Sequence, residues 1–474
     1  ALDAALSTDA TPEANLGVTI AHAKGAVRFS RADGTRAESD ELIADVPNQQ
    51  AQLAGPVVVL AKGDSAVTGE RMRLDGTTGR LEVVGPGVFQ HEGKTKDGEP
   101  RLASARWTGP DASMTFEDST GVLEATSPNG RTVAEAMPDA RTIDKLEAAF
   151  VRVLLTPSPA DALANDREVL SVVATAASEA NASPTPTPTT TPAVVKVESR
   201  RYAAAITDLD EGDKKPALER LLYLESTRVE ADNAKGTVHV PAPGKLFVLA
   251  GKDAKAADAA GRTAADRSAA LAADLAASTT PDSARLDRSR SLFHWNGTMT
   301  MTRAASGSSD DHAMVMDGGV KLTSERESDK TLTQLDCTKL SAWLTPAEAG
   351  RGEQEGVSKD NAAPSDPSSL TPHPSPPPTS PSPLPTSPTD LRGELSRALA
   401  EGNANLKSGT KTLQGDLIDY DPANGTATAG SRDNSTVSLI DDESASPITA
   451  RGILWDMKRG RVEVKNVSTV VAPR

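Results

Sequence analysis

The side chains that could perform catalysis or bind a metal are few and widely separated in this chain. The single cysteine, Cys337, lies among alternating polar and apolar residues, where we expect a small half-buried strand residue and not a nucleophile. The six histidines have no partner motif, and no Cys/His spacing resembles a zinc site. We therefore expect no catalytic residue, no metal and no cofactor, in a protein that is not an enzyme.

Two stretches resemble ligand loops without meeting their requirements. Asp208–Asp213 with Glu219 resembles a calcium loop, but its glycine is at the fifth position instead of the sixth, so we interpret it as a solvated acidic loop. Val83–Phe89 resembles a phosphate loop but lacks the Lys-Ser/Thr pair and a following helix, so we interpret it as a turn between strands. A carboxylate pair for polysaccharide hydrolysis stays open, although no pair stands out among the many acidic residues.

The clearest structural signal is a hairpin near the end of the chain. Val462 and Val464 alternate with charged residues, which is typical of a strand with one buried face. Asp456 precedes Gly460 by four residues; the carboxylate can accept hydrogen bonds from nearby amides, and the glycine can adopt a positive φ. These features predict a tight reversal between two strands.

The same Asp-x-x-x-Gly reversal recurs along the chain. The further copies are Asp75 with Gly79, Asp232 with Gly236, Asp421 with Gly425, and a looser copy with Glu117 and Gly121. Such recurrence indicates a repeated unit, and one hairpin alone is marginal in water, so we expect the hairpins to stack. Asn296-Gly297 predicts a further two-residue hairpin turn.

The order of these signals predicts an all-β fold of stacked antiparallel hairpins in separate blocks. Residues 142–155 are ambiguous, because Leu146, Phe150, Val153 and Leu154 fit a helix whereas Phe150–Leu155 also fits a strand. Pro/Ser/Thr-rich stretches predict flexible linkers. The expected divisions are a β block at 1–140, an insertion and linker at 141–196, a second β block at 197–345 with an Ala-rich insertion at 251–282, a linker at 346–392, and a third β block at 393–474.

Composition excludes some functions. The 474 residues carry a net charge of −15 without a dense basic cluster, which disfavours nucleic acid, and no apolar run is long enough to span a membrane as a helix. The sequence begins at Ala1, so it is either a mature protein without its secretory signal or part of a longer chain. The first alternative predicts a location in the periplasm or envelope, or outside the cell.

The repeated unit also resembles a known family. A Gly-x-Val strand, an Ile/Leu-x-Ala strand and then an aromatic or Leu-Asp-x-x-x-Gly-x-Val-x-Val hairpin are similar to the OstA-like family of periplasmic lipopolysaccharide-transport proteins. The nearest stretches are Gly415 to Gly430, Ile448 to Lys465 and Val67 to Gly85, with Leu292 to Leu344 looser. The resemblance implies an open β-jelly roll that carries lipid acyl chains and joins similar proteins through its edge strands.

An apolar groove is the candidate site. If the stack stays open on one side, its apolar face suits acyl chains at about 0.8 kcal/mol per buried methylene. The alternative is purely structural: the same side chains fill a closed core. The candidate groove residues are Met72, Leu74, Leu81, Val83, Val229, Val238, Val240, Leu417, Ile453, Trp455, Val462 and Val464. The expected ligand is lipopolysaccharide or another acyl lipid; the alternatives are a structural or adhesive β-repeat protein and a polysaccharide-active enzyme.

Overall fold

The structure is a computed structural model that describes most of the chain. It covers residues 2–6, 18–30, 34–94, 100–156, 169–177, 194–202, 206, 218–251, 288–303, 312–326, 330–345, 394–431, 435–443 and 446–469. All 30 elements defined in these residues are β-strands, and they form one antiparallel sheet. The all-β prediction is confirmed.

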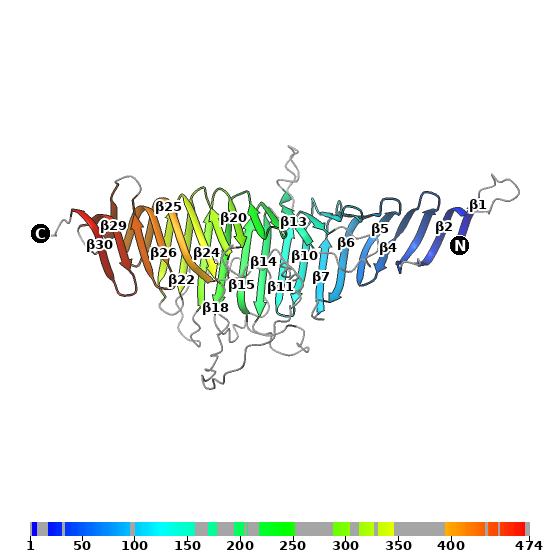
Figure 1. Cartoon of the computed structure of the whole chain (residues 1–474). Coiled ribbons are helices and arrows are strands. Elements are labelled where there is room, and N and C mark those ends of the chain that lie inside the picture. The colour runs from blue at the N-terminus through cyan, green and yellow to red at the C-terminus, as the bar shows by residue number, and fades with distance from the viewer. Residues whose placement is uncertain are drawn as a thin grey trace, which may run out of the picture.

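The strands follow one another closely along the chain (Figure 1). Those before residue 156 are β1 Leu2–Leu6, β2 Val18–Ser30, β3 Arg36–Asp45, β4 Gln50–Lys62, β5 Ser65–Asp75, β6 Arg80–Lys94, β7 Pro100–Trp107, β8 Ser113–Glu117, β9 Val122–Thr126, β10 Thr132–Asp139, β11 Thr142–Ala148 and β12 Phe150–Leu155. Those that follow, up to residue 345, are β13 Val169–Thr175, β14 Val195–Tyr202, β15 Leu218–Ser226, β16 Arg228–Asp232, β17 Thr237–Val240, β18 Gly244–Gly251, β19 Arg288–Trp295, β20 Met299–Arg303, β21 His312–Met316, β22 Val320–Arg326, β23 Leu332–Cys337 and β24 Lys339–Thr345. The last are β25 Glu394–Ser408, β26 Lys411–Asp421, β27 Thr426–Gly430, β28 Val437–Asp441, β29 Ile448–Asp456 and β30 Arg461–Thr469.

This sheet is folded along its length into two ladders. From β6 onward the first ladder runs β6, β8, β9, β12, β13, β16, β17, β20, β21, β24, β25, β26, β27, β29 and β30. The second runs β6, β7, β10, β11, β14, β15, β18, β19, β22, β23, β25, β26, β28 and β29. Among the described strands, the ladders share hydrogen bonds only through long strands that belong to both. The N- and C-termini lie at opposite ends of the stack (Figure 1).

The long strands turn from one ladder to the other at bulges. In the β4–β5 pair the register shifts between Ala54 and Val58, and in the β5–β6 pair it shifts between Gly69 and Arg71. A bulge bends its strand and increases the local twist, so a row of bulges produces a corner. Elsewhere a short link crosses the same corner, as Asn296–Thr298 does between β19 and β20.

Tryptophan packs against glycine at two places along the corner. Trp107 pairs with Gly87, and Trp295 pairs with Gly244, in neighbouring strands of the second ladder. Trp295 Nε1 donates a 2.9 Å hydrogen bond to the carbonyl of Ala242, in the link between the ladders. A Cβ atom at Gly244 would lie 2.5 Å from the indole of Trp295, so no other residue fits there without a shift. Gly244 therefore leaves space for the Trp295 indole, whose hydrogen bond to Ala242 holds the link at the corner.

All five reversals predicted from the sequence are hairpin turns. Gly460, Gly425, Gly79, Gly236 and Gly121 have φ between 60° and 70°, the region that L-residues other than glycine seldom adopt.

The Asp residues cap these turns as expected. At the β5–β6 turn, Asp75 Oδ1 accepts hydrogen bonds from the Thr77 hydroxyl at 2.5 Å, the Thr77 amide at 2.9 Å and the Thr78 amide at 3.2 Å. These donors, the Thr77 hydroxyl first, lower the pKa of Asp75 below its ordinary value.

We expect the Asp75 turn to weaken in acid. Because its pKa is lower in the folded state, Asp75 stabilises the turn above its unfolded-state pKa, and this contribution is lost as pH falls through the folded value, below about pH 4. Hydrogen exchange at the Thr77 and Thr78 amides should therefore report a smaller opening free energy at low pH. Asp75→Asn keeps an acceptor but cannot titrate, so an equal pH dependence in this variant would contradict the assignment.

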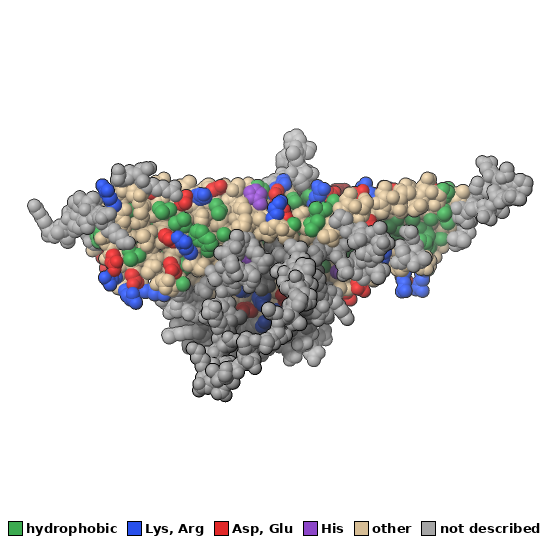
Figure 2. Space-filling model, in the orientation of Figure 1, with side chains coloured by type: hydrophobic (Ala, Val, Ile, Leu, Met, Phe, Trp, Pro, Cys, Tyr) green, Lys and Arg blue, Asp and Glu red, His purple; other side chains and the backbone are tan. Residues whose placement is uncertain are grey.

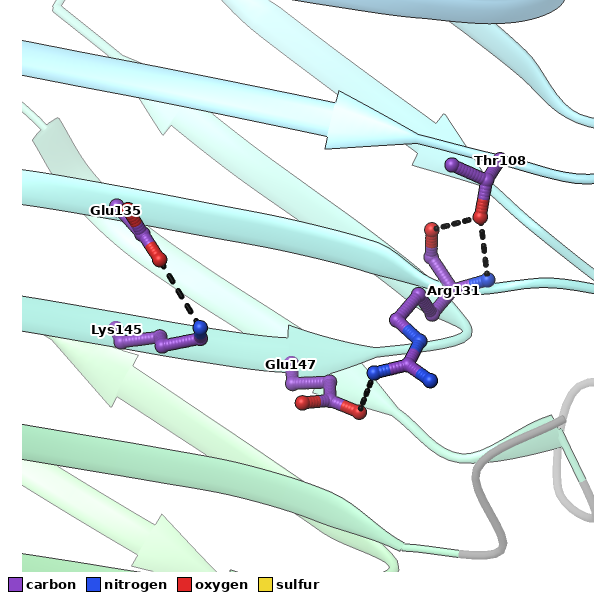
Figure 3. Close-up of polar contacts among 5 residues, drawn as sticks. All are labelled: Thr108, Arg131, Glu135, Lys145 and Glu147. Carbon is purple, nitrogen blue, oxygen red and sulfur yellow. Dashed lines mark hydrogen bonds and ion pairs between the residues drawn. The ribbon is translucent and has the colours of Figure 1, made fainter. Parts of the chain in front are cut away.

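Ion pairs and hydrogen bonds tie neighbouring strands together on the outer face of the second ladder (Figure 3). Arg131 Nη1 donates to Glu147 Oε1 at 3.1 Å, and Lys145 Nζ lies 3.0 Å from Glu135 Oε1. The Thr108 hydroxyl donates to the Arg131 carbonyl at 3.1 Å and accepts from the Arg131 amide at 3.2 Å, which joins two corner links. These polar side chains lie on the face of the second ladder opposite Leu146.

The prediction of a hairpin at Asn296-Gly297 is wrong. β19 pairs with β18 and β22, whereas β20 pairs with β17 and β21, so this dipeptide joins two different ladders. The Gly297 amide donates to the Asp317 carbonyl at 3.0 Å, and the Thr298 amide donates to Asp317 Oδ1 at 2.7 Å. Asn-Gly forms a corner here because the link between β19 and β20 is hydrogen-bonded to the link between β21 and β22.

The predicted division into separate blocks is also wrong in the described residues. β10 and β11 pair across the expected boundary at 140, and β25 pairs with β23 and β24 across the expected linker. Phe150–Leu155 is strand β12, which resolves the helix-or-strand ambiguity, so most of 142–175 continues the sheet instead of forming an insertion. Val83–Phe89 is a bend within β6 and not a turn between strands.

Some predictions fall on residues outside those described. They are the Pro/Thr-rich linker at 183–189, residues 252–282 of the Ala-rich insertion, the linker at 346–392 and the acidic loop at 208–213.

Candidate functional site: an apolar trough

The apolar faces of the two ladders point toward each other and line one long interior. In the first ladder, consecutive paired residues on this face are Leu42, Leu53, Met72, Val83, Met114, Ala125, Val151, Ala174 and Val229, and the row resumes with Val240, Met299, Met316, Leu340, Ala400, Ile418, Ala429, Ile453 and Val464. In the second ladder the facing row includes Phe29, Leu60, Phe89, Leu146, Val197, Leu224, Leu246, Phe293, Leu322, Leu335, Leu406, Leu413 and Leu439. Two-residue alternation keeps each row on one side of its ladder.

Near the N-terminal end the inner faces of the two ladders are less completely buried than in the middle. Six large apolar side chains on the inner faces of β2–β9 are only partly buried: Phe29, Leu42, Leu74, Phe89, Phe116 and Leu123. Phe29 and Phe89 belong to the second ladder and the other four to the first, so they face one another across the interior. Below them, Met72 and Val83 are 1% and 0% exposed and form the floor beside the corner. We call this region the open trough.

Figure 2 shows hydrophobic side chains gathered over the strands at the N-terminal end. Ile20 and Ile43 are exposed on the outer face of β2 and β3. Their neighbours His22 and Glu41 form a hydrogen bond of 2.7 Å. Apolar surface is therefore present on both sides of this end of the first ladder.

The middle of the interior is sealed by its own side chains. Buried apolar residues from Ala148 to Trp455 form a second core cluster, separate from the one beneath the open trough. The partly buried apolar residues that pack against this second cluster lie on β11–β13 or from β29 onward, and none of them lies between β14 and β27. Across this part, Cα atoms of β18 and β25 approach within 8 Å although the two strands do not pair. We call this region the sealed core.

The predicted groove residues divide between these two regions. Met72, Leu74, Leu81 and Val83 all belong to the open trough, where Leu74 is partly exposed. The others that face inward belong to the second cluster: Val229, Val238, Val240, Ile453, Trp455, Val462 and Val464. Val229, Val238 and Val240 lie in the sealed core and are 6%, 7% and 0% exposed, whereas Met72, Leu81 and Val83 are 1%, 8% and 0% exposed. The two sets are therefore buried to the same degree, and whether either lines a groove stays a prediction.

Leu417 is on the wrong face for a groove residue. It pairs with Glu401 and Gly430 on the outer side of the first ladder, whereas its neighbours Ile418 and Tyr420 enter the core. The prediction is wrong because a shift of one residue in a strand exchanges the two faces.

Sequence reasoning missed five residues of the open trough: Phe29, Leu42, Phe89, Phe116 and Leu123. Phe116 and Leu123 flank the looser reversal at Glu117–Gly121, and their pairing in β8–β9 matches that of Leu74 and Leu81 in β5–β6. Applying the hairpin pattern to this looser copy would have identified both. Phe29 and Phe89 lie in halves of long strands beyond a bulge, where the alternation changes phase.

The interior contains few ionisable side chains. Asp144, on the same face of β11 as Leu146, is 7% exposed and accepts a 2.7 Å hydrogen bond from the Ser199 hydroxyl. Burial raises the pKa of the Cys337 thiol to about 12, so it is a protonated core side chain and not a nucleophile. Burial, and then Lys245 and Lys321, lower the pKa of His294 on the outer face. In the described part of the chain, no group of three or more His, Cys, Asp or Glu side chains is arranged to hold a metal ion.

The described residues contain no helix with the length and hydropathy needed to cross a membrane. Compared with models of known protein families and with curated protein sequences, the chain matches none of them.

Proposed function

We propose that this protein binds the acyl chains of a lipopolysaccharide-like lipid in the open trough, and that it carries or bridges this lipid within the cell envelope as a member of the OstA-like family. The observation that carries the proposal is the set of six inward-facing apolar side chains that remain partly exposed on β2–β9. Water-exposed apolar surface is costly, and a concave apolar surface is the usual form of a lipid or small-molecule site. No catalysis is part of this proposal.

The lining of the open trough supports acyl chains over polar ligands. All six side chains are hydrocarbon, and their partners across the ladders, such as Leu53 and Val67, are hydrocarbon as well. Each methylene that such a surface removes from water contributes about 0.8 kcal/mol. A sugar or peptide would leave its polar groups without hydrogen-bond partners there.

The ends of the stack support an assembly role. Among the described strands, β1 pairs only with β2 and β30 pairs only with β29, so each has one edge without a strand partner. Unpaired backbone donors and acceptors at a sheet edge can pair with another chain. These edges lie at opposite ends (Figure 1), which suits a chain of similar β proteins.

Lipid extraction and a fluorescent fatty acid test the proposal. We expect the purified chain to retain acyl lipid detectable by mass spectrometry. After delipidation it should bind the fluorescent fatty acid, and lipopolysaccharide should displace the probe. Absence of both retained lipid and probe binding would contradict the proposal.

The sealed core favours a second function, that of a structural or adhesive β-repeat protein. From β14 to β27 the interior is filled by buried apolar side chains, as in stacked-repeat proteins that serve as rigid spacers. Self-association through the end strands without any lipid would support this alternative over lipid binding.

A further inference from the structure

Half of the methionines in this chain lie in one patch of the sealed core. The sequence contains eight methionines, and four of them are Met299 and Met301 on β20 and Met314 and Met316 on β21. Each pair has the form Met-x-Met, so both sulfur-bearing side chains of a pair lie on the same face of their strand.

The register brings the two pairs together. Met299 pairs with Met316 and Met301 pairs with Met314, so four thioether side chains occupy two consecutive rungs. All four belong to the same core cluster and are 0–1% exposed. Directly opposite residues have Cβ atoms about 5 Å apart, and the unbranched methionine side chain is flexible enough for the sulfurs to converge.

Ordinary packing does not require methionine here. In the second ladder, β19 and β22, the strands next in sequence to β20 and β21, carry Phe293 and Leu322 at paired inward positions. Leucine has better-defined rotamers than methionine and is the usual core residue. The distinctive property of the four side chains is therefore their sulfur atoms.

We propose that Met299, Met301, Met314 and Met316 form a binding site for one copper(I) ion. Thioethers are soft, neutral ligands, and such ligands select copper(I) over hard divalent cations. Their cross-strand neighbours are Val238 and Val240 on β17 and Leu340 and Ala342 on β24, which offer no side-chain oxygen ligands that would favour calcium or magnesium.

A histidine stands at the outer end of the patch. His312 begins β21, lies on the same face as Met314 and is 9% exposed. Imidazole is also a ligand for copper, and His312 lies at the end of β21 that is farther from the corner link at Asp317. It could supply a further ligand beside the four sulfurs.

An anaerobic copper(I) titration tests this site. Full-length protein with Cys337→Ala, which removes the only thiol, is titrated against a chromophoric copper(I) chelator, and we expect one ion per chain. Met301→Leu with Met314→Leu should weaken binding by about a hundredfold or more. Met72→Leu with Met114→Leu is the matched control, because both residues are 1% exposed in the other cluster, and it should bind like the parent protein.

Methionine-to-leucine changes conserve volume and cost less than about 1.5 kcal/mol each, so circular dichroism should show that all variants are folded. X-ray absorption at the copper edge gives a reading that does not depend on variants, and we expect sulfur neighbours. The proposal is overturned by absent binding, by binding that the Met301/Met314 change leaves intact, by equal loss in the control, or by a first shell of oxygen.

Discussion

Leu74→Asp with Phe116→Asp is expected to weaken acyl-chain binding strongly. Both side chains lie on the inner face of the first ladder, both are partly exposed, and an acyl chain in the open trough would cover them. A covered carboxylate without a partner costs several kcal/mol, and each 1.4 kcal/mol is a factor of about ten in affinity. We expect the double variant to bind a fluorescent fatty acid at least about a hundredfold more weakly.

Ile20→Asp with Ile43→Asp is the matched control for this double variant. Ile20 and Ile43 are 48% and 41% exposed on the outer face of β2 and β3. The control introduces the same two charges at the same end of the stack but outside the trough, so probe affinity should not change. Equal loss in both proteins would show that the probe binds the outer face or that charge alone weakens binding.

Trp295→Ala is expected to cause the largest loss of stability. Trp295 is 1% exposed, packs on Gly244 and donates to the Ala242 carbonyl in the link between the ladders. Removing a buried tryptophan costs about 3–5 kcal/mol, and this change also leaves a carbonyl at the corner without its donor. Stacked repeats can open locally, so the effect should be concentrated in β18 and β19.

Hydrogen exchange followed by mass spectrometry measures this local loss. Amides of β18 and β19 should exchange at rates that correspond to an opening free energy lower by about 3–5 kcal/mol. Trp343→Ala provides the comparison, because that ring is half-buried on the outer face with the Arg397 guanidinium 5.2 Å from its centroid. Its loss should cost about 1 kcal/mol. Similar exchange in the two variants would contradict the corner role of Trp295.

The fold class could be predicted because hairpin turns are local. Asp75 and Gly79 need only the residues between them to specify a reversal, and all five such reversals occur in the structure. The corners are not local in this sense. Asn296-Gly297 has the composition of a hairpin turn, and only the bonds to Asp317, on a distant link, show that it joins two ladders.

The candidate site was predictable in part for the same reason. Alternation within a hairpin placed Met72, Leu74, Leu81 and Val83 on the inner face. Whether an inner face is open or sealed depends on side chains from the other ladder, which are remote in sequence. Val238 and Leu81 follow the same pattern and are buried alike, at 7% and 8% exposed, but they belong to different core clusters.

Photo-crosslinking with a diazirine-bearing fatty acid tests the open trough most directly. Bound probe is activated by light, and the labelled peptides are identified by mass spectrometry. We predict labels on the strands that carry Phe29, Leu74, Phe89 and Phe116, with competition by lipopolysaccharide. Labels confined to the outer-face residues Ile20 and Ile43, or to the sealed core between β14 and β27, would contradict the account.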